Sequence, residues 1–225
     1  MHIGLIGGIG PAATVFYYER IVQAFAAAEQ PLHLTIAHTS ALTLSRNVAT
    51  GRADAQAAEF NRVTGQLAAA GAEVVVITSM GGHFCAQAFA ALSPLPMING
   101  PESVAAYLKQ QGIRRIGILG TRVVMETHLY GVLSELEPVV PIGSDLTQVN
   151  DDYVAMATAG AATPDQRERL LAAGERLVRD QGAEAVLLGG TDLNVVYDRV
   201  SLDFPVIDSA AVHVDAIVNM ALAQS

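Results

Sequence analysis

The sequence predicts an α/β protein made of two similar domains with mainly parallel sheets. Two observations predict this fold class. Apolar runs rich in β-branched residues alternate with longer segments of helical period, a pattern typical of βαβ units. The chain also resembles itself, because three motifs of its first half return in the same order in its second half. We therefore expect two pseudo-symmetric three-layer α/β domains with an active-site cleft between them.

The expected strands are continuous apolar runs, as in sheets that are covered on both faces. They are 2–7, 32–38, 73–79, 115–120, 185–190 and 204–208. The segments between them are rich in Ala, Leu and Glu and have the helical period. Examples are 13–28 and 165–181, and a last helix is expected at 209–224.

The internal repeat consists of three pairs of similar segments. IGLIGGIGPAATVFYYERI from Ile3 resembles IGILGTRVVMETHLYGVL from Ile116, GAEVVVITSM from Gly71 resembles GAEAVLLGGT from Gly182, and PMINGPESVAAYL from Pro96 resembles PVIDSAAVHVDAI from Pro205. The spacing within the pairs is nearly constant. We expect a first domain of 1–97 together with 208–225, and a second domain of 98–207.

The repeat also points to the position of a site. In open α/β sheets, ligands bind beyond the carboxyl ends of the strands. The spacing that joins Gly71 to Gly182 pairs Ser79 with Gly190, each just after a buried strand. We therefore expect these two positions to flank the cleft.

Composition narrows the class of protein. Half of the 225 residues are hydrophobic and the formal net charge is −9, which argues against nucleic acid or an anionic membrane as a partner. A single cysteine excludes an intrachain disulfide, and no Cys/His spacing resembles a zinc site, so no metal is expected. The N-terminus MHIGLIGG lacks the basic region of a signal peptide, and no apolar segment is long enough to span a bilayer. We expect a cytoplasmic protein.

The loop ITSMGGHFC, residues 77–85, offers several reactive groups directly after a strand. Thr78 and Ser79 carry hydroxyls, and His83 is a candidate general acid or simply a hydrogen-bonded or exposed loop residue. Cys85, the only cysteine, is either a displaced catalytic thiol or a buried packing residue at the start of a helix. We expect Gly81 and Gly82 to leave room and to present amides for a ligand.

The first loop, GGIGPAA, allows three interpretations. Gly8, Gly10 and Ala13 fit the dinucleotide pattern G-x-G-x-x-G/A, but the acidic residue expected after the second strand is missing. A tight turn whose amides bind a small anion at a helix N-terminus, with Pro11 in the first helical turn, is simpler. A purely structural turn is the third interpretation. We predict that Gly8, Ile9 and Gly10 bind substrate.

Two further loops carry polar candidates. Arg46 ends HTSALTLSRN after the second strand and is either a carboxylate ligand or a solvated charge. Thr191 and Asp192 follow Gly190; Asp192 either caps the next helix or acts as a base or an amine ligand. Thr121 stands in the second half where the repeat places the first-loop turn, and we count it among the substrate-binding candidates.

These motifs resemble the aspartate/glutamate racemase family over nearly the whole chain. IGLIGGIGPAAT, ITSMGGH and LLGGTDL match the family in order. The resemblance implies two pseudo-symmetric α/β domains, amino-acid racemisation without pyridoxal phosphate or any other cofactor, and a homodimer. It also implies that Arg46 binds the distal carboxylate of the substrate.

The family patterns of the two strand-end loops are C-N-T-x-H and G-C-T-E. In the first loop Ser79 stands at the cysteine and His83 matches the histidine, while Met80 and Gly81 replace the Asn and Thr. In the second loop Gly189, Thr191 and Asp192 fit, and Gly190 stands at the cysteine. A lysine expected just before Gly160 is absent.

A two-thiol mechanism is therefore excluded, because glycine supplies no group and a serine hydroxyl needs an adjacent base. We expect a racemase-like isomerase of a small acidic amino acid or related carboxylate. Ser79 or Thr78 would act on one side, and His83, Asp192 or Cys85 on the other. The alternatives are a one-sided lyase or decarboxylase of a small carboxylic acid, and a non-catalytic binder of an acidic metabolite.

Overall fold

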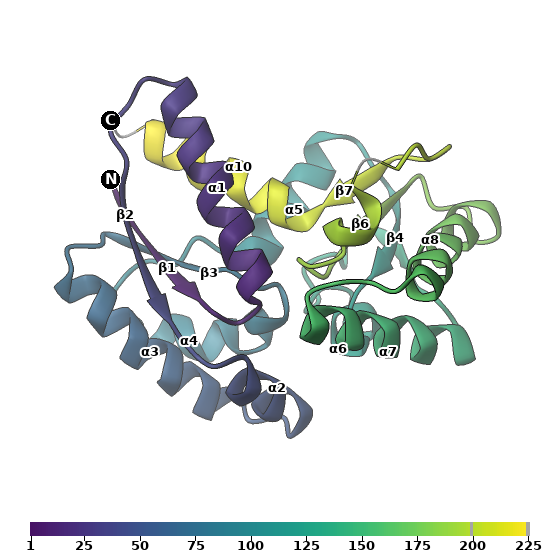
Figure 1. Ribbon diagram of the computed structural model, residues 1–225, viewed down its shortest axis with the longest axis horizontal. Coiled ribbons are helices and arrows are strands. Elements are labelled where there is room, and N and C mark those ends of the chain that lie inside the picture. Colours follow the sequence, from purple (N-terminus) through teal and green to yellow (C-terminus); the bar gives the residue numbers. More distant parts are fainter. Residues whose placement is uncertain (199, 224–225) are drawn as a thin grey trace. The chain divides into compact units, whose positions relative to one another are not determined.

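A computed structural model describes residues 1–198 and 200–223 (Figure 1). The chain divides into two compact units. Unit 1 comprises Met1–Ser103 and the chain from His213 on, and unit 2 is Val104–Val212. Residues 224 and 225, with which the predicted last helix and first domain end, lie outside the described residues.

Unit 1 contains a three-stranded parallel sheet with strand order β2-β1-β3. Its strands are β1 (His2–Gly7), β2 (His33–His38) and β3 (Val74–Ile77). Helices α1 (Pro11–Ala27), α2 (Ala41–Ala49) and α3 (Ala53–Ala69) connect them. Pro11 occupies the first turn of α1, where its missing N–H leaves no hydrogen bond unmade.

Two glycines of β1 show that helices cover both faces of this sheet. Side chains of a strand alternate between faces, so positions 4 and 7 point to opposite sides. A Cβ added at Gly4 would contact Leu67 of α3, whereas one added at Gly7 would contact Thr14 of α1. Unit 1 is therefore a three-layer structure, with α1 and α3 on opposite faces of the sheet.

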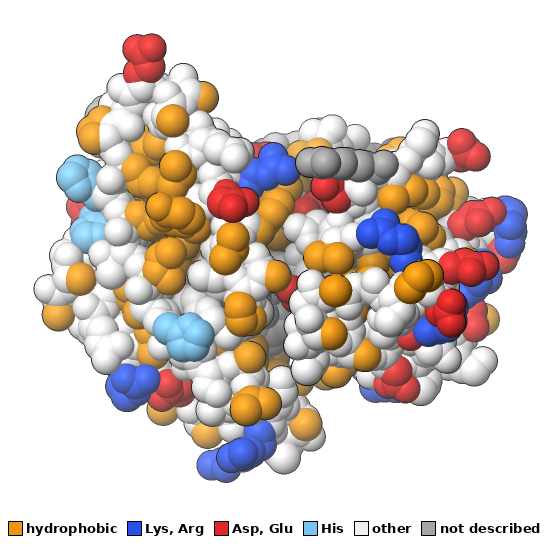
Figure 2. All heavy atoms as spheres, viewed as in Figure 1, with side chains coloured by type: hydrophobic (Ala, Val, Ile, Leu, Met, Phe, Trp, Pro, Cys, Tyr) orange, Lys and Arg blue, Asp and Glu red, His pale blue; other side chains and the backbone are white. Residues whose placement is uncertain are grey.

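The chain after β3 forms the 3-10 helix η1 (Gly81–Cys85), then α4 (Ala86–Leu92) and α5 (Gly100–Gln110). Met97 forms a single parallel bridge with Val75 of β3. The outer face of α1 carries exposed apolar side chains, namely Val15, Tyr18 and Val22, and Figure 2 shows apolar side chains gathered over α1 and β2.

Unit 2 contains a four-stranded parallel sheet with strand order β5-β4-β6-β7. The strands are β4 (Arg115–Leu119), β5 (Glu137–Val139), β6 (Ala185–Leu188) and β7 (Val206–Asp208). The helices are α6 (Arg122–Glu126), α7 (Ser144–Ala159), α8 (Pro164–Arg179) and α9 (Asn194–Tyr197); α10 (Ser209–Leu222) follows β7. No helix among the described residues has the length and apolarity that crossing a bilayer requires.

The pairing registers of the two sheets confirm the internal repeat. In unit 1 Ile3 pairs with Val74, and in unit 2 the repeat counterpart Ile116 pairs with Ala185. The predicted fold class, α/β with parallel sheets in two similar units, is thus confirmed. All six predicted strands are present, although 73–79 and 185–190 end earlier, at Ile77 and Leu188.

Strand β5 was not predicted from the sequence. It has three residues, includes Pro138, and lies at an edge of the sheet with none of its residues fully buried. An edge strand of this kind has no continuous apolar run, because only a fully covered strand needs one.

Candidate active site

The turn after β1 is held by packing and by hydrogen bonds with the Thr14 hydroxyl. Gly8 has a φ of 83°, and an added Cβ would lie 2.5 Å from the backbone oxygen of Thr39. Its N–H donates to the Thr14 hydroxyl at 3.0 Å. The side chain of Ile9 is buried in the core, so only its backbone remains for a ligand. Glycine is therefore required at position 8 whether or not the turn binds an anion.

Thr78 links the ends of β1 and β3. Its hydroxyl donates to the Ile6 carbonyl at 2.9 Å and lies 3.1 Å from the Thr14 hydroxyl. Thr14 has its own acceptor in the Gly10 carbonyl at 3.1 Å. Because Thr78 is fully buried and its proton has a backbone acceptor, this geometry favours a structural role for Thr78.

Ser79 follows Thr78 and lies at the carboxyl end of β3. Its Oγ accepts from the Gly82 N–H at 3.3 Å, which leaves the hydroxyl proton available for another acceptor. A Cβ added at Gly81 would meet only the Ser79 Oγ, at 3.6 Å, whereas one at Gly82 would lie 2.8 Å from the Ile77 side chain. Gly82 is thus required for packing, and Gly81 leaves space beside the Ser79 hydroxyl.

His83 is buried, and both of its ring nitrogens form hydrogen bonds with backbone groups. Its Nε2 accepts from the Gly100 N–H at 3.2 Å, so its Nδ1 carries the proton and donates to the Ser79 carbonyl at 2.8 Å. Burial lowers the pKa of His83 to about 4, and the ring is neutral near pH 7. This geometry favours a positioning role for His83 over the acid–base role predicted from the sequence.

His213 of α10 packs edge-on against His83, with ring centroids 5.9 Å apart. Its Nε2 donates to the Ile98 carbonyl at 2.9 Å, and its Nδ1 accepts from the Tyr17 hydroxyl at 2.9 Å. Burial, followed by the proximity of His83, lowers the pKa of His213 to about 3. The two histidines thus anchor the segment before α5 inside unit 1.

Cys85 is the last residue of η1, and its side chain is buried. Its Sγ donates to the Gly82 carbonyl at 3.4 Å, and burial raises the pKa of the thiol to about 12. The thiolate is the reactive form of cysteine, so a thiol with such a pKa is inert at neutral pH. The geometry favours the packing role among the two that the sequence left open.

The folded protein is therefore expected to resist alkylation at Cys85. Iodoacetamide at pH 8 should modify the native chain far more slowly than the chain unfolded in guanidinium chloride, as measured by mass spectrometry of the intact protein. The unfolded sample is the matched control, since Cys85 is the only thiol in either sample. Labelling of the folded chain at the rate of the unfolded chain would contradict the burial described above.

Arg46 lies exposed in the last turn of α2. Within the described part of the chain its guanidinium forms no ion pair, so the cation is available to an external carboxylate. By contrast, the Arg62 guanidinium pairs with Glu59 at 2.7 Å.

In unit 2, the loop after β6 brings a tyrosine against a glycine. The ring tip of Tyr153, from α7, occupies the space beside Gly190, and a Cβ added at Gly190 would lie 2.8 Å from the Tyr153 hydroxyl oxygen and closer still to the ring carbons. The Tyr153 hydroxyl donates to Asp192 Oδ2 at 3.3 Å. Both side chains are buried.

Asp192 is a buried carboxyl group with an altered proton affinity. Burial raises its pKa, and the hydrogen bond from Tyr153 partly opposes that shift. The side chain does not cap a helix, since the N-cap of α9 is Leu193, without a side-chain hydrogen bond. Of the other candidates, Thr191 is buried beside Asp192, and Thr121 caps α6 by accepting from the Val124 N–H at 3.4 Å.

The family of this chain follows from comparison with known proteins. Residues 6–217 match the model of the Asp/Glu/Hydantoin racemase family. The chain belongs to this family. A candidate Asp/Glu racemase from Yersinia pestis is 30% identical, with a TM-score of 0.85 over 99% of this chain and 100% of that one. The predicted family is confirmed.

Two more distant solved structures share the fold. An aspartate racemase homologue from Pyrococcus horikoshii has 23% identity and a TM-score of 0.81, over 98% of this chain and 99% of that one. Glutamate racemase from Francisella tularensis, solved with D-glutamate, has 14% identity and a TM-score of 0.68, over 99% and 81%. Family and neighbours together support an isomerase of the Asp/Glu racemase type.

A strained turn in unit 2 of this racemase-family chain lies close to Tyr153. His128, Leu129 and Tyr130 all have left-handed φ angles of 50 to 61° and are followed by Gly131 at 81°. Each such non-glycine residue costs on the order of 1–3 kcal/mol and persists only where its surroundings hold it. Leu129 is fully buried. The pKa of Tyr153 is raised chiefly by burial and next by Asp192, and Tyr130 is near enough to add a smaller upward contribution.

Tyr153 is the site residue that the sequence did not reveal. It lies on the buried stripe of α7 with Leu146, Val149 and Met156, a spacing that indicates core packing. The sequence feature that could have pointed to a role for Tyr153 is its hydroxyl group, because a buried tyrosine usually requires a hydrogen-bond partner. The partner, Asp192, is far away in the sequence.

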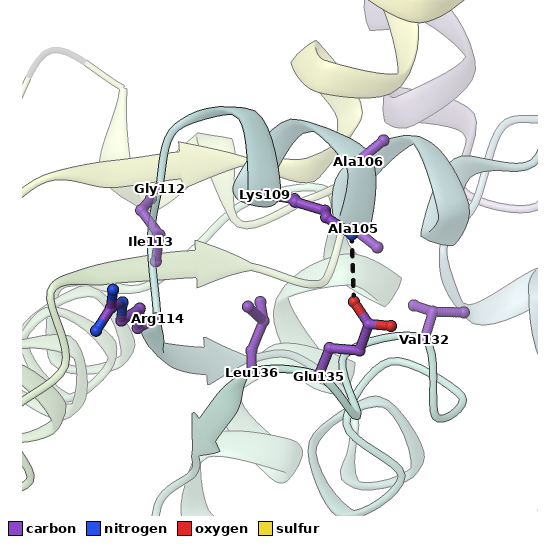
Figure 3. Close-up of a pocket in the computed structure, with 9 residues that line it drawn as sticks. All are labelled: Ala105, Ala106, Lys109, Gly112, Ile113, Arg114, Val132, Glu135 and Leu136. Atoms are coloured by element: carbon purple, nitrogen blue, oxygen red, sulfur yellow. Dashed lines mark hydrogen bonds and ion pairs between the residues drawn. The ribbon is translucent and has the colours of Figure 1, made fainter.

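The surface pocket of unit 2 shown in Figure 3 lies elsewhere. Its volume is about 520 Å³, and Lys109 and Glu135 form an ion pair of 3.5 Å at its edge. None of the predicted site residues lines it. Over the described residues, no group of three His, Cys, Asp or Glu side chains is arranged to hold a metal ion.

Proposed function

We propose that this chain is a cofactor-independent isomerase that removes and returns the α-proton of a small acidic amino acid or a related carboxylate. The observation that carries this proposal is Asp192, a buried carboxyl group beyond the end of β6 whose pKa is raised by burial. A carboxylate with a raised pKa is a stronger base than one in water, as proton abstraction from carbon requires. Membership of the racemase family supports the reaction class.

The chemistry assigned to Asp192 is a single proton transfer. Its carboxylate takes the proton from Cα, the electrons of the broken C–H bond move into the substrate's carboxylate, and the resulting enediolate is protonated again. Inversion needs a second group that gives a proton to the opposite face of the enediolate. Within unit 1, the Ser79 hydroxyl has a proton that it can donate, and Gly81 leaves space beside it.

Unit 1 contains groups that can bind a carboxylate. Arg46 is an exposed guanidinium without an ion-pair partner among the described residues, and guanidinium groups bind carboxylates through two parallel hydrogen bonds. The turn Gly8–Gly10 precedes α1, whose first turn contains no acidic residue, and a helix N-terminus favours an anion. In this proposal Thr78, His83 and Cys85 hold the loops and do not exchange protons with substrate.

Deuterium exchange at Cα tests the proposal. The protein is incubated in D₂O with L- or D-aspartate or L- or D-glutamate, and Cα deuteration is followed by proton NMR while chiral chromatography measures the two enantiomers. We expect deuterium in at least one acid, accompanied by the opposite enantiomer. Deuteration with retained configuration would indicate a one-sided reaction. If no acid exchanges but one raises the melting temperature, a binder replaces the enzyme.

A further inference from the structure

The tip of the Tyr153 ring packs against Gly190 in unit 2. The space into which a side chain at position 190 would project is filled by the tip of the Tyr153 ring, since an added Cβ would lie 2.8 Å from the phenolic oxygen. A tyrosine from α7 therefore places a hydroxyl group where residue 190 has no side chain.

The Tyr153 hydroxyl binds the carboxyl group to which we assigned the proton transfer. It donates to Asp192 Oδ2 at 3.3 Å, between two side chains that are 8% and 7% exposed. A hydrogen bond to a buried carboxylate stabilises its charged form and fixes its orientation. Without this donor, Asp192 would be buried with less compensation for its charge.

We propose that Tyr153 is the positioning residue of this site. Its ring occupies the space left by Gly190, and its hydroxyl group holds Asp192 oriented and ionised for proton transfer. This inference rests on the proposed function, because it assigns the base that Tyr153 serves. A positioning role differs from simple packing in one respect, because the activity then requires the hydroxyl group of Tyr153 and not only its ring.

The decisive variant is Tyr153→Phe, which keeps the ring beside Gly190 and removes the donor. We expect Cα exchange to fall about 10- to 100-fold, the effect of losing a hydrogen bond to a charged group. We also expect the acidic limb of the kcat/KM profile to move to higher pH, because Asp192 loses the partner that lowers its pKa. KM should change less than kcat.

Tyr197→Phe is the matched control. Tyr197 is buried in the same unit, and its hydroxyl donates to the Leu170 carbonyl at 2.8 Å, away from Asp192. It also packs against a glycine, Gly174, as Tyr153 packs against Gly190. The control should lower the melting temperature without moving the pH profile.

A readout that does not need activity completes the test. Carbon-13 NMR titration of the Asp192 carboxyl group, assigned by its absence in Asp192→Asn, should show a higher pKa in Tyr153→Phe than in the wild type. Gly190→Ala, which displaces the ring, should give the same upward direction. An unchanged titration and an unchanged pH profile in Tyr153→Phe overturn the positioning role and leave the proposed function standing. Absence of Cα exchange in the wild-type protein overturns both.

Discussion

Asp192→Asn is expected to reduce Cα exchange by about 10²- to 10⁴-fold, the usual contribution of a general base. The amide has nearly the shape of the carboxyl group but cannot take up a proton. Tyr153 can still donate to the amide oxygen, so the packing beside Gly190 should persist. The rate of deuterium incorporation into the substrate measures the effect.

Stability should move in the opposite direction to activity in this variant. Burial raises the pKa of Asp192, which means that the folded state holds its charged form less favourably than the unfolded state does. Replacing it by a neutral amide at pH 7 should leave the melting temperature unchanged or raise it. Activity lost without stability lost would indicate a functional carboxylate.

Asp145→Asn is the control for the change of charge. Asp145 lies on α7 of the same unit and pairs with Arg176 at 3.0 Å, with both side chains well exposed. An exposed pair of this kind contributes about 0–1 kcal/mol, so its loss should alter neither exchange nor stability appreciably. Full exchange by Asp192→Asn, with the control unchanged, would remove Asp192 from the mechanism.

The fold could be predicted largely because the repeat constrains distant parts of the chain. Each apolar run alone is compatible with a strand or a buried helix, but three ordered matches fix which runs correspond. The bridge between Val75 and Met97 in unit 1 and the pairing of Val186 with Val206 in unit 2 are one such correspondence. Strand β5 lacks an apolar run, so the same reasoning did not find it.

The site was less predictable because its side chains are defined by partners that lie far away in the sequence. The sequence indicates that His83 follows a strand, yet its protonation depends on the backbone of Ser79 and Gly100. Likewise, Tyr153 appears as a core residue until the structure places Asp192 against its hydroxyl. Strand ends identify the loops that carry polar groups, but not which groups remain accessible to a proton.

The second large effect expected is a loss of stability in acid that originates from His83 and His213. Both are fully buried, and their pKa values are lowered to about 4 and about 3, from about 6.5 in the unfolded chain. At pH values between the lowered pKa values of the folded state and the unfolded value of about 6.5, the unfolded state binds protons that the folded state does not. The free energy of unfolding is therefore highest above pH 6.5 and falls as the pH is lowered, by up to about 2.7 kcal/mol per pH unit for two protons.

Other groups change this slope but do not reverse it. The pKa of Asp152 is lowered chiefly by its hydrogen bond from Arg169, and that of Glu59 chiefly by its bond from Arg62, so both add to the loss at lower pH. Asp192, whose pKa is raised, has the opposite sign and offsets at most one proton. Urea unfolding at a series of pH values measures the combined effect of these groups on the free energy of unfolding.

The variants His83→Gln and His213→Gln isolate the two histidines, because glutamine can form hydrogen bonds but does not titrate. Each should reduce the acid slope by about one proton, or about 1.4 kcal/mol per pH unit, even if it lowers stability at pH 7. The wild-type chain is the reference for both variants. An equal slope in the wild type and in both variants would show that the buried histidines do not cause the loss.

These measurements also separate stability from catalysis. In the folded state His83 and His213 stay neutral to well below pH 6, so neither can produce an activity limb near neutrality. An acidic limb of kcat/KM that persists in the glutamine variants and moves upward in Tyr153→Phe therefore belongs to Asp192. If the limb instead disappears with His83, the base lies in unit 1, and the neutral histidine described above would have to lose its bond to Gly100 during the reaction.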